Sequence, residues 1–192
     1  MEVRANRESW LGAAFTALAE GGADRVRVEV LAKQLHVTKG SFYWHFRDRG
    51  ELMDTLLDTW KTGRIETIKR QTQLDGTPAA ERLRSLLSLY LDGSKPRGIA
   101  IELAMRDWAR RDAKAAAAVA EVDQERLRCV SALFSALGLT SQDAFARAYL
   151  FYSFIFGEGL LVQDRASPAI DTARRICAGL LVPGGGAPVS AL

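Results

Sequence analysis

The chain has 192 residues and a formal net charge of +3, and 48% of its residues are hydrophobic and 26% charged. This balance is typical of a globular protein with a buried core, and the length allows one large domain or two small ones. Two cysteines and two histidines, far apart, predict no metal site, and no cofactor motif is present. The N-terminus lacks an apolar signal region and no clean membrane span follows, so we expect a cytoplasmic protein with no membrane partner.

Apolar residues at helical spacing predict a first helix over residues 4–20. Trp10, Ala14, Ala17 and Leu18 form one stripe, and Gly21-Gly22 ends the helix. The next two predicted helices are too short to bury a core by themselves. The first helix is therefore expected to pack against their inner side.

Residues 28–46 predict two short helices joined by a tight turn. Val28, Leu31 and Leu35 mark one face of the first, and Thr38 is a suitable N-cap for the second. Phe42 and Phe46 lie four positions apart and are expected to pack inward. This arrangement is typical of a helix-turn-helix, which places its second helix in the DNA major groove.

The outer side of the second short helix combines a cation, a hydroxyl and aromatic rings, with no carboxylate. Such side chains contact phosphates, base edges and thymine methyl groups. Arginine just before the first short helix is a candidate for gripping phosphate, with a plain solvated side chain as the alternative. The residues predicted to bind DNA on this basis are Arg27, Thr38, Lys39, Gly40, Ser41, Tyr43, Trp44 and His45.

The run VTKGSFYWHFRDRGELMDTLL, within residues 4–63, closely resembles the DNA-binding domain of TetR-family transcriptional regulators. The resemblance implies a nine-helix, all-α, two-domain protein that is not an enzyme. It also implies that Arg49 contacts phosphate. His36 departs from the family pattern, which often has glycine in the turn. The position is expected to need a left-handed backbone, which histidine tolerates better than β-branched residues do.

The remaining chain continues as helices. Asp48 and Glu51 fit a capping box that starts a fourth helix, running to about Arg70. Further helices are predicted over residues 77–92, 99–110, 112–137, 141–162 and 168–181, with a loop over 94–98. We therefore expect a DNA-binding domain over 1–63, with the helix-turn-helix at about 27–46, a C-terminal ligand-binding and dimerisation domain over 64–182, and a flexible tail over 183–192.

The helix over 141–162 is apolar nearly all round, which predicts burial on several sides. The TetR resemblance implies a homodimer built from this helix and the next, with Phe151, Ile155, Gly159, Ile176 and Leu180 at the interface. Glu158 is an unusual charge in this helix. It is expected to pair with an arginine across the dimer, or alternatively to bind a cationic or hydroxylated ligand.

The resemblance also implies a small-molecule effector in the second domain, making the protein a ligand-responsive repressor of a palindromic operator. The aromatic and sulfur-bearing candidates for the pocket are Met105, Trp108, Phe134, Tyr149 and Tyr152, and ordinary core packing is the alternative for each. The rival function is a ligand-independent DNA-binding scaffold whose C-terminal domain serves only dimerisation or partner recruitment. No catalytic constellation is recognisable, because the grouped carboxylates lie beside arginines on helices and are expected to form solvated ion pairs.

Overall fold

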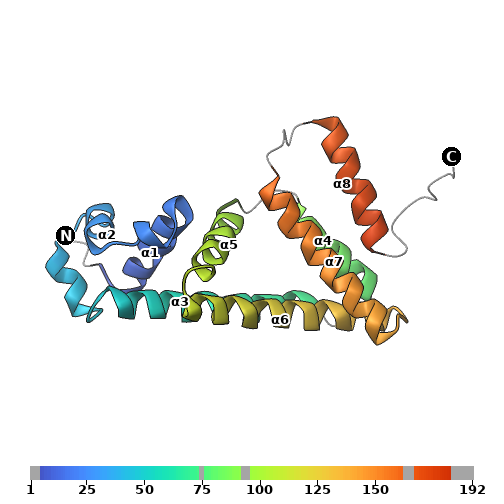
Figure 1. The fold of residues 1–192 in the computed structure, drawn as a ribbon, viewed down its shortest axis with the longest axis horizontal. Helices are drawn as coiled ribbons and strands as arrows, with labels where there is room; N and C mark the ends of the chain where they lie inside the picture. Colours follow the sequence, from blue (N-terminus) through green and yellow to red (C-terminus); the bar gives the residue numbers. More distant parts are fainter. Residues whose placement is uncertain (1–4, 74–75, 92–95, 162–166, 183–192) are drawn as a thin grey trace. The chain divides into compact units, whose positions relative to one another are not determined.

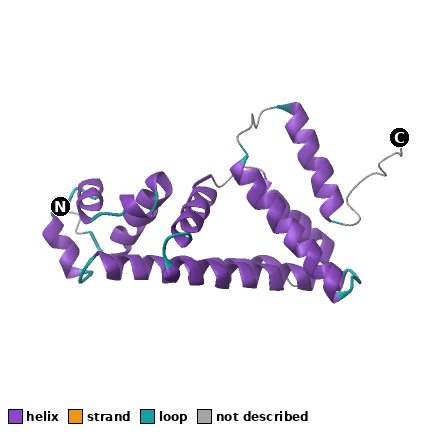
Figure 2. Cartoon of the chain, in the orientation of Figure 1, coloured by secondary structure: helices purple, strands orange, loops and turns teal. Residues whose placement is uncertain are grey.

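The computed structural model describes residues 5–73, 76–91, 96–161 and 167–182, and within these ranges the chain forms helices and no strand (Figures 1 and 2). The predicted all-α fold is confirmed. The chain divides into two compact units, the first drawn from residues 1–64 and 96–122 and the second from 65–95 and 123–192. The predicted tail over 183–192 lies outside the described residues, as do the helix boundaries predicted at residues 4, 92 and 162.

The first unit contains α1 (Arg7–Gly21), η1 (Ala23–Arg25), α2 (Val28–Gln34), η2 (Lys39–Trp44) and α5 (Pro96–Ala109). The second contains α4 (Ala79–Leu91), α7 (Ser141–Leu160) and α8 (Pro168–Leu181), while α3 (Arg49–Thr72) and α6 (Ala113–Ala136) contribute residues to both. Two elements differ from expectation. The second short helix of the helix-turn-helix, η2, is a 3₁₀ helix, and α5 already begins at Pro96, within the predicted loop. Proline is well suited to the first helical position.

The core of the first unit joins α1 to the helix-turn-helix. Asn6 caps α1 by accepting a hydrogen bond from the Ser9 backbone N–H at 2.8 Å. Trp10 of α1 packs edge-on against Phe42 at 5.2 Å between ring centroids, and Phe42 stacks on Phe46 at 5.4 Å. The inward prediction for both phenylalanines is correct, since each is at most 1% exposed. Figure 1 shows α1, α2 and η2 gathered around the beginning of α3.

The core of the second unit is formed by α4, α7 and the C-terminal part of α6. Phe134 of α6 meets Phe151 of α7 with ring centroids 6.5 Å apart, among buried leucines of α4. Arg126 is buried here at 1% exposure and pairs with Asp123 at 2.9 Å. Its guanidinium also lies 5.2 Å from the centroid of the Phe156 ring, a distance suited to a cation–π contact. Among the described helices, none is long and apolar enough to cross a membrane.

Candidate DNA-binding site

The turn between α2 and η2 is closed by two backbone hydrogen bonds. His36 N–H donates to the Lys33 carbonyl at 3.2 Å, and Val37 N–H donates to the Ala32 carbonyl at 3.0 Å. This pair of bonds is a Schellman motif, which requires a left-handed residue after the helix. His36 takes that conformation with a φ of 56°, as the sequence predicted.

The outer side of η2 carries most of the side chains predicted to bind DNA. Trp44 is 87% exposed and Tyr43 is 63% exposed. Thr38, Lys39 and Gly40 are also exposed, whereas Ser41 and His45 are partly buried. The hydroxyl of Ser41 lies inside and makes no hydrogen bond to any described residue. The structure therefore leaves a cation, a threonine hydroxyl and two aromatic rings exposed along η2 and at its N-cap.

Lys39 is held by an acidic residue that the sequence analysis did not single out. Its Nζ lies 2.8 Å from Oε1 of Glu29 on α2, and both side chains are more than half exposed. The hydrogen bond from Lys39 lowers the pKa of the Glu29 carboxyl, with further contributions from a backbone hydrogen bond and from the charge of Lys39. The surface predicted to bind a polyanion thus contains a carboxylate at its edge.

The two predicted arginines both contact backbone carbonyls within the first unit. Arg27 Nε donates to the Asp24 carbonyl at 2.8 Å. Arg49 donates from Nε to the Val26 carbonyl at 2.6 Å and from Nη2 to the Ala23 carbonyl at 2.8 Å. Arg49 therefore fastens the start of α3 to η1, a role that the sequence analysis did not assign. Its predicted contact with phosphate remains a prediction.

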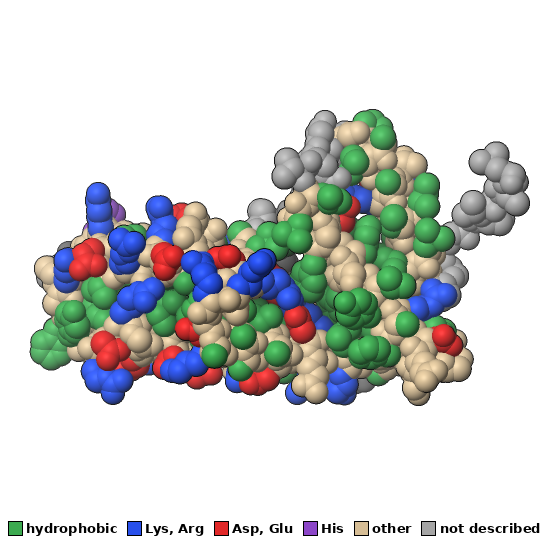
Figure 3. Space-filling view, viewed as in Figure 1, with side chains coloured by type: hydrophobic (Ala, Val, Ile, Leu, Met, Phe, Trp, Pro, Cys, Tyr) green, Lys and Arg blue, Asp and Glu red, His purple; other side chains and the backbone are tan. Residues whose placement is uncertain are grey.

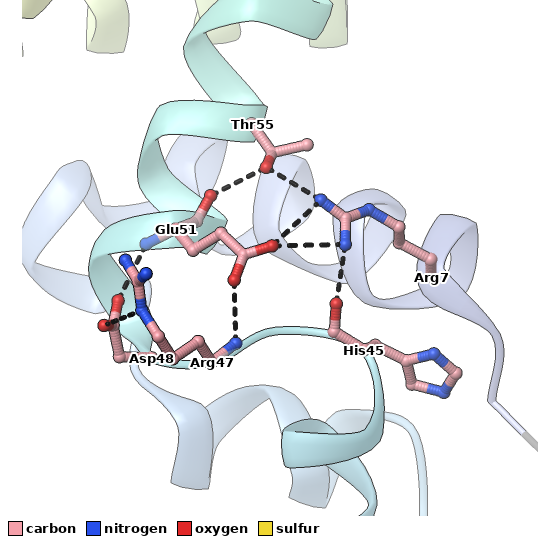
Figure 4. A network of polar contacts seen from close by, with 6 residues as sticks. All are labelled: Arg7, His45, Arg47, Asp48, Glu51 and Thr55. Carbon is pink, nitrogen blue, oxygen red and sulfur yellow. Dashed lines mark hydrogen bonds and ion pairs between the residues drawn. The ribbon is translucent and has the colours of Figure 1, made fainter.

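A polar network at the start of α3 positions the end of η2 (Figure 4). Arg7 Nη1 donates to the His45 carbonyl at 2.6 Å, and Nη2 reaches Thr55 Oγ1 at 3.1 Å and Glu51 Oε1 at 3.3 Å. Its guanidinium lies 4.3 Å from the centroid of the Phe46 ring. No local motif marks Arg7, because its partners are about forty residues away in sequence.

The predicted cap of α3 is present in a shifted form. Asp48 Oδ1 accepts from the Glu51 N–H at 2.9 Å, but Glu51 Oε2 accepts from Arg47 N–H at 2.8 Å instead of from Asp48. These backbone hydrogen bonds are the main reason that the pKa of each carboxyl is lowered. The cap thus keeps two charged carboxylates next to the end of η2.

The five predicted pocket residues are distributed over both units. Met105 and Trp108 are buried in the first unit, and Phe134 and Tyr152 are buried in the second. Tyr149 is 61% exposed on the surface of α7. Trp108 lines a pocket of about 530 Å³ in the first unit, whereas a groove of about 640 Å³ in the second unit is lined by none of the five.

The predicted interface residues divide between core and surface. Phe151 and Ile155 are buried in the subunit's own core, because the face of α7 that carries them packs on α4 and α6. Ile176 and Leu180 are 54% and 65% exposed on α8, and Gly159 is partly buried. Figure 3 shows hydrophobic side chains gathered over α7 and α8. The large exposed ones on these helices are Phe145, Tyr149, Leu150, Leu160, Ile176 and Leu180. Glu158 does pair with an arginine, but with Arg174 of the same chain at 2.6 Å.

Residues 11–56 match the family model described as "Bacterial regulatory proteins, tetR family". The chain is similar in fold to a TetR transcriptional regulator from Legionella pneumophila, with a TM-score of 0.74 and 12% identity over 95% of this chain and 100% of that one. It is also similar to a transcriptional regulator from Saccharomonospora viridis in complex with choline, with a TM-score of 0.73 and 18% identity over 89% of this chain and 92% of that one. The similarity to the transcriptional regulator FadR from Bacillus subtilis, in complex with stearoyl-CoA, has a TM-score of 0.65 and 18% identity over 93% of this chain and 99% of that one.

Comparison with curated proteins gives no match. The similarity to solved structures extends over both units and establishes the fold, while the family match lies on the helix-turn-helix and its supporting helices. TetR-family regulators are DNA-binding proteins and not enzymes. The helix-turn-helix region therefore belongs to the tetR family of bacterial regulatory proteins, and the chain as a whole has the fold of TetR transcriptional regulators.

Proposed function

We propose that the chain is a ligand-responsive, homodimeric repressor that binds a palindromic operator. The observation that carries the DNA-reading part is the exposed surface of η2, where Lys39, Tyr43 and Trp44 project while Phe42 and Phe46 anchor the helix. Lysine contacts phosphates or guanine edges, and aromatic rings contact sugars and thymine methyl groups. Residues 1–63 would form the DNA-binding domain and residues 64–182 the ligand-binding and dimerisation domain.

The exposed apolar faces of α7 and α8 support a homodimer. Contiguous apolar surface of this kind is uncommon on monomers and marks interaction sites. Because a two-fold dimer presents two identical reading heads, the operator would be palindromic, with half-sites about 34–36 Å apart or more widely separated. Ile176 and Leu180 are the proposed contacts on α8, together with the exposed residues of α7.

A response to a small molecule is supported by the complexes of two structural neighbours, one with choline and one with stearoyl-CoA. In the proposed mechanism, binding in the second domain shifts α5 against α3 and alters the separation of the reading heads. A coupling free energy of about 1–3 kcal/mol is enough for useful release of the operator. Repression follows if the operator overlaps a promoter.

The test is selection of random duplex DNA by the purified chain, followed by binding measurements for wild type, Lys39→Ala and Tyr43→Phe. We expect a palindromic winner, weaker binding by Lys39→Ala and altered base preference for Tyr43→Phe. Arg70→Gln, an exposed arginine on α3 in the second unit, is the matched control. Binding without any enriched sequence would instead indicate non-specific electrostatic attraction and support the scaffold function.

A further inference from the structure

The second unit contains a groove between α4 and α8 with a volume of about 640 Å³. This volume lies within the range of small-molecule sites in proteins, about 300–1,000 Å³. Leu87 of α4 and Val182 at the end of α8 form its apolar floor, and both are at most 2% exposed. The groove is therefore a hollow over the packed core and not a gap through it.

The rim of the groove is basic. Arg84 of α4 and Arg174 and Arg175 of α8 line it, together with Asp171, and Glu158 lies behind Arg174. Arg174 Nε bonds Glu158 Oε2 at 2.6 Å and Arg175 Nε bonds Asp171 Oδ2 at 3.2 Å. Each guanidinium carries five N–H donors, so these bonds orient Arg174 and Arg175 and leave further donors on these two residues for a bound anion.

We propose that this groove is the effector site and that it binds an anionic amphiphile, with a carboxylate or phosphate head on the arginines and a short apolar body on Leu87 and Val182. The inference rests on the proposed ligand response, for which it supplies a place and a ligand class. A neutral apolar molecule would fill the floor and leave the arginine donors without a new partner. A cation would be repelled by the rim.

The position of the groove on α8 connects it with the proposed dimer contact. Asp171, Arg175 and Val182 lie on one side of the helix, whereas Ile176 and Leu180 lie about half a turn away, on the opposite side. A ligand that draws Arg175 towards Arg84 acts on the same helix that presents these two apolar residues to the partner. Ligand binding would thereby change the packing of one subunit against the other.

Calorimetric titration of the full-length protein, without DNA, tests the site. The probes are octanoate and octyl phosphate, with octanol and octylamine as the neutral and cationic controls. We expect both anions to bind more tightly than octanol, and the preferred head to distinguish carboxylate from phosphate chemistry. Arg84→Gln and Arg175→Gln should each weaken anion binding about 5–10-fold, which corresponds to one charge-assisted hydrogen-bonded contact.

Asp171→Asn should act in the opposite direction and tighten anion binding several-fold, because it removes the negative charge from the rim. Arg70→Gln, an exposed arginine outside the groove, should leave binding unchanged, and thermal melts will show that each variant is folded. The proposal is overturned if octanol binds as well as octanoate, or if the groove variants bind both anions as wild type does.

Operator affinity, measured without any probe, separates the two proposals. If the operator is bound but no anion is, the groove assignment fails alone. If the anions bind with the expected variant pattern but no operator is recognised, the repressor proposal fails and the groove assignment stands. If both hold, octanoate or octyl phosphate should also lower operator affinity in wild type more than in Arg84→Gln.

Discussion

The ion pair between Lys39 and Glu29 lies at the edge of the surface proposed to read DNA. Lysine must exchange this partner for phosphate or a base edge when DNA binds, and the carboxylate repels phosphate. We predict that Glu29→Gln binds random-sequence DNA about 2–5-fold more tightly at low salt, with a smaller gain for the selected operator. Fluorescence anisotropy with both duplexes measures this ratio. Asp58→Asn, which removes an exposed charge from α3, is the control for net charge. An equal gain for both duplexes would mean that Glu29 plays no part in specificity.

His36 occupies the left-handed position of the Schellman motif with a φ of 56°. A residue with a Cβ atom loses about 1–2 kcal/mol of stability in this conformation. Glycine avoids this strain, but it loses more conformational entropy on folding, so the net gain from glycine is smaller. We predict that His36→Gly raises the melting temperature by about 2–4 °C. Lys33→Gly, in the last turn of α2, is the matched substitution and should lower it. A decrease for His36→Gly would show that the histidine ring makes a stabilising contact.

The cap of α3 predicts a dependence of stability on pH. Backbone hydrogen bonding lowers the pKa of Glu51 from its ordinary value of 4.5 in the folded state. The resulting stability is present above pH 4.5 and is lost as the pH falls below it through the lowered folded-state pKa. We predict that Glu51→Gln melts a few degrees below wild type at pH 7, and that the difference shrinks below about pH 4. Glu66→Gln, exposed further along α3, should show no such pattern. A difference that persists in acid would place the effect in packing and not in charge.

Arg49 allows its two roles to be separated by experiment. Its guanidinium donates one hydrogen bond to the Val26 carbonyl, just after η1, at 2.6 Å and one to the Ala23 carbonyl of η1 at 2.8 Å. We predict that Arg49→Gln lowers the melting temperature by about 2–4 °C, because the carbonyls lose their donors. If the arginine also contacts phosphate, the slope of log affinity against log salt should decrease by about one. Arg47→Gln, on the exposed neighbouring arginine, provides the comparison. An unchanged melting temperature with a reduced slope would assign Arg49 to DNA alone.

Helical elements were predictable wherever a periodic apolar face and a cap occur together. The restart at Ser167-Pro168 marks the beginning of α8, and Thr140 caps α7 in the structure. The 3₁₀ geometry of η2 was not predictable, because the spacing of Phe42 and Phe46 fits one face of an α-helix, whereas η2 ends at Trp44 and Phe46 lies beyond it. Pro96 was assigned to a loop because flanking glycines obscured its suitability as a first helical residue.

The proposed dimer uses the outer faces of α7 and α8, and this proposal can be tested against the subunit's own core. We predict that Leu180→Glu, at a residue 65% exposed, shifts the protein from dimer to monomer with little change in helicity. Phe151→Ala should instead destabilise the subunit by about 3–5 kcal/mol, because it empties a buried site. Analytical ultracentrifugation and thermal melts distinguish the two outcomes. Ala132→Glu, on the exposed side of α6, is the control. If the Leu180→Glu protein is still a dimer, Leu180 of α8 does not lie in the dimer interface.

Long-range partnerships account for most of what the sequence could not predict. The apolar composition of α7 predicted burial on several sides, but it did not show which face meets the subunit's own core, where Phe151 and Ile155 lie. Glu158 was predicted to pair with an arginine, yet its partner is Arg174 of the same chain. Periodicity identifies the apolar face of a helix, whereas the neighbour of that face depends on how distant segments pack.

The unequal exposure of the four tryptophans has a spectroscopic consequence. Trp10, Trp60 and Trp108 are 0%, 5% and 8% exposed, while Trp44 is 87% exposed on η2. Emission excited at the red edge should come mainly from Trp44 and should be quenched by acrylamide. Duplex DNA bound against η2 would shield this indole from the quencher and shift its emission, while the three buried indoles continue to report on folding. Trp44 would therefore be an intrinsic optical probe of the proposed operator binding, and no attached dye is needed.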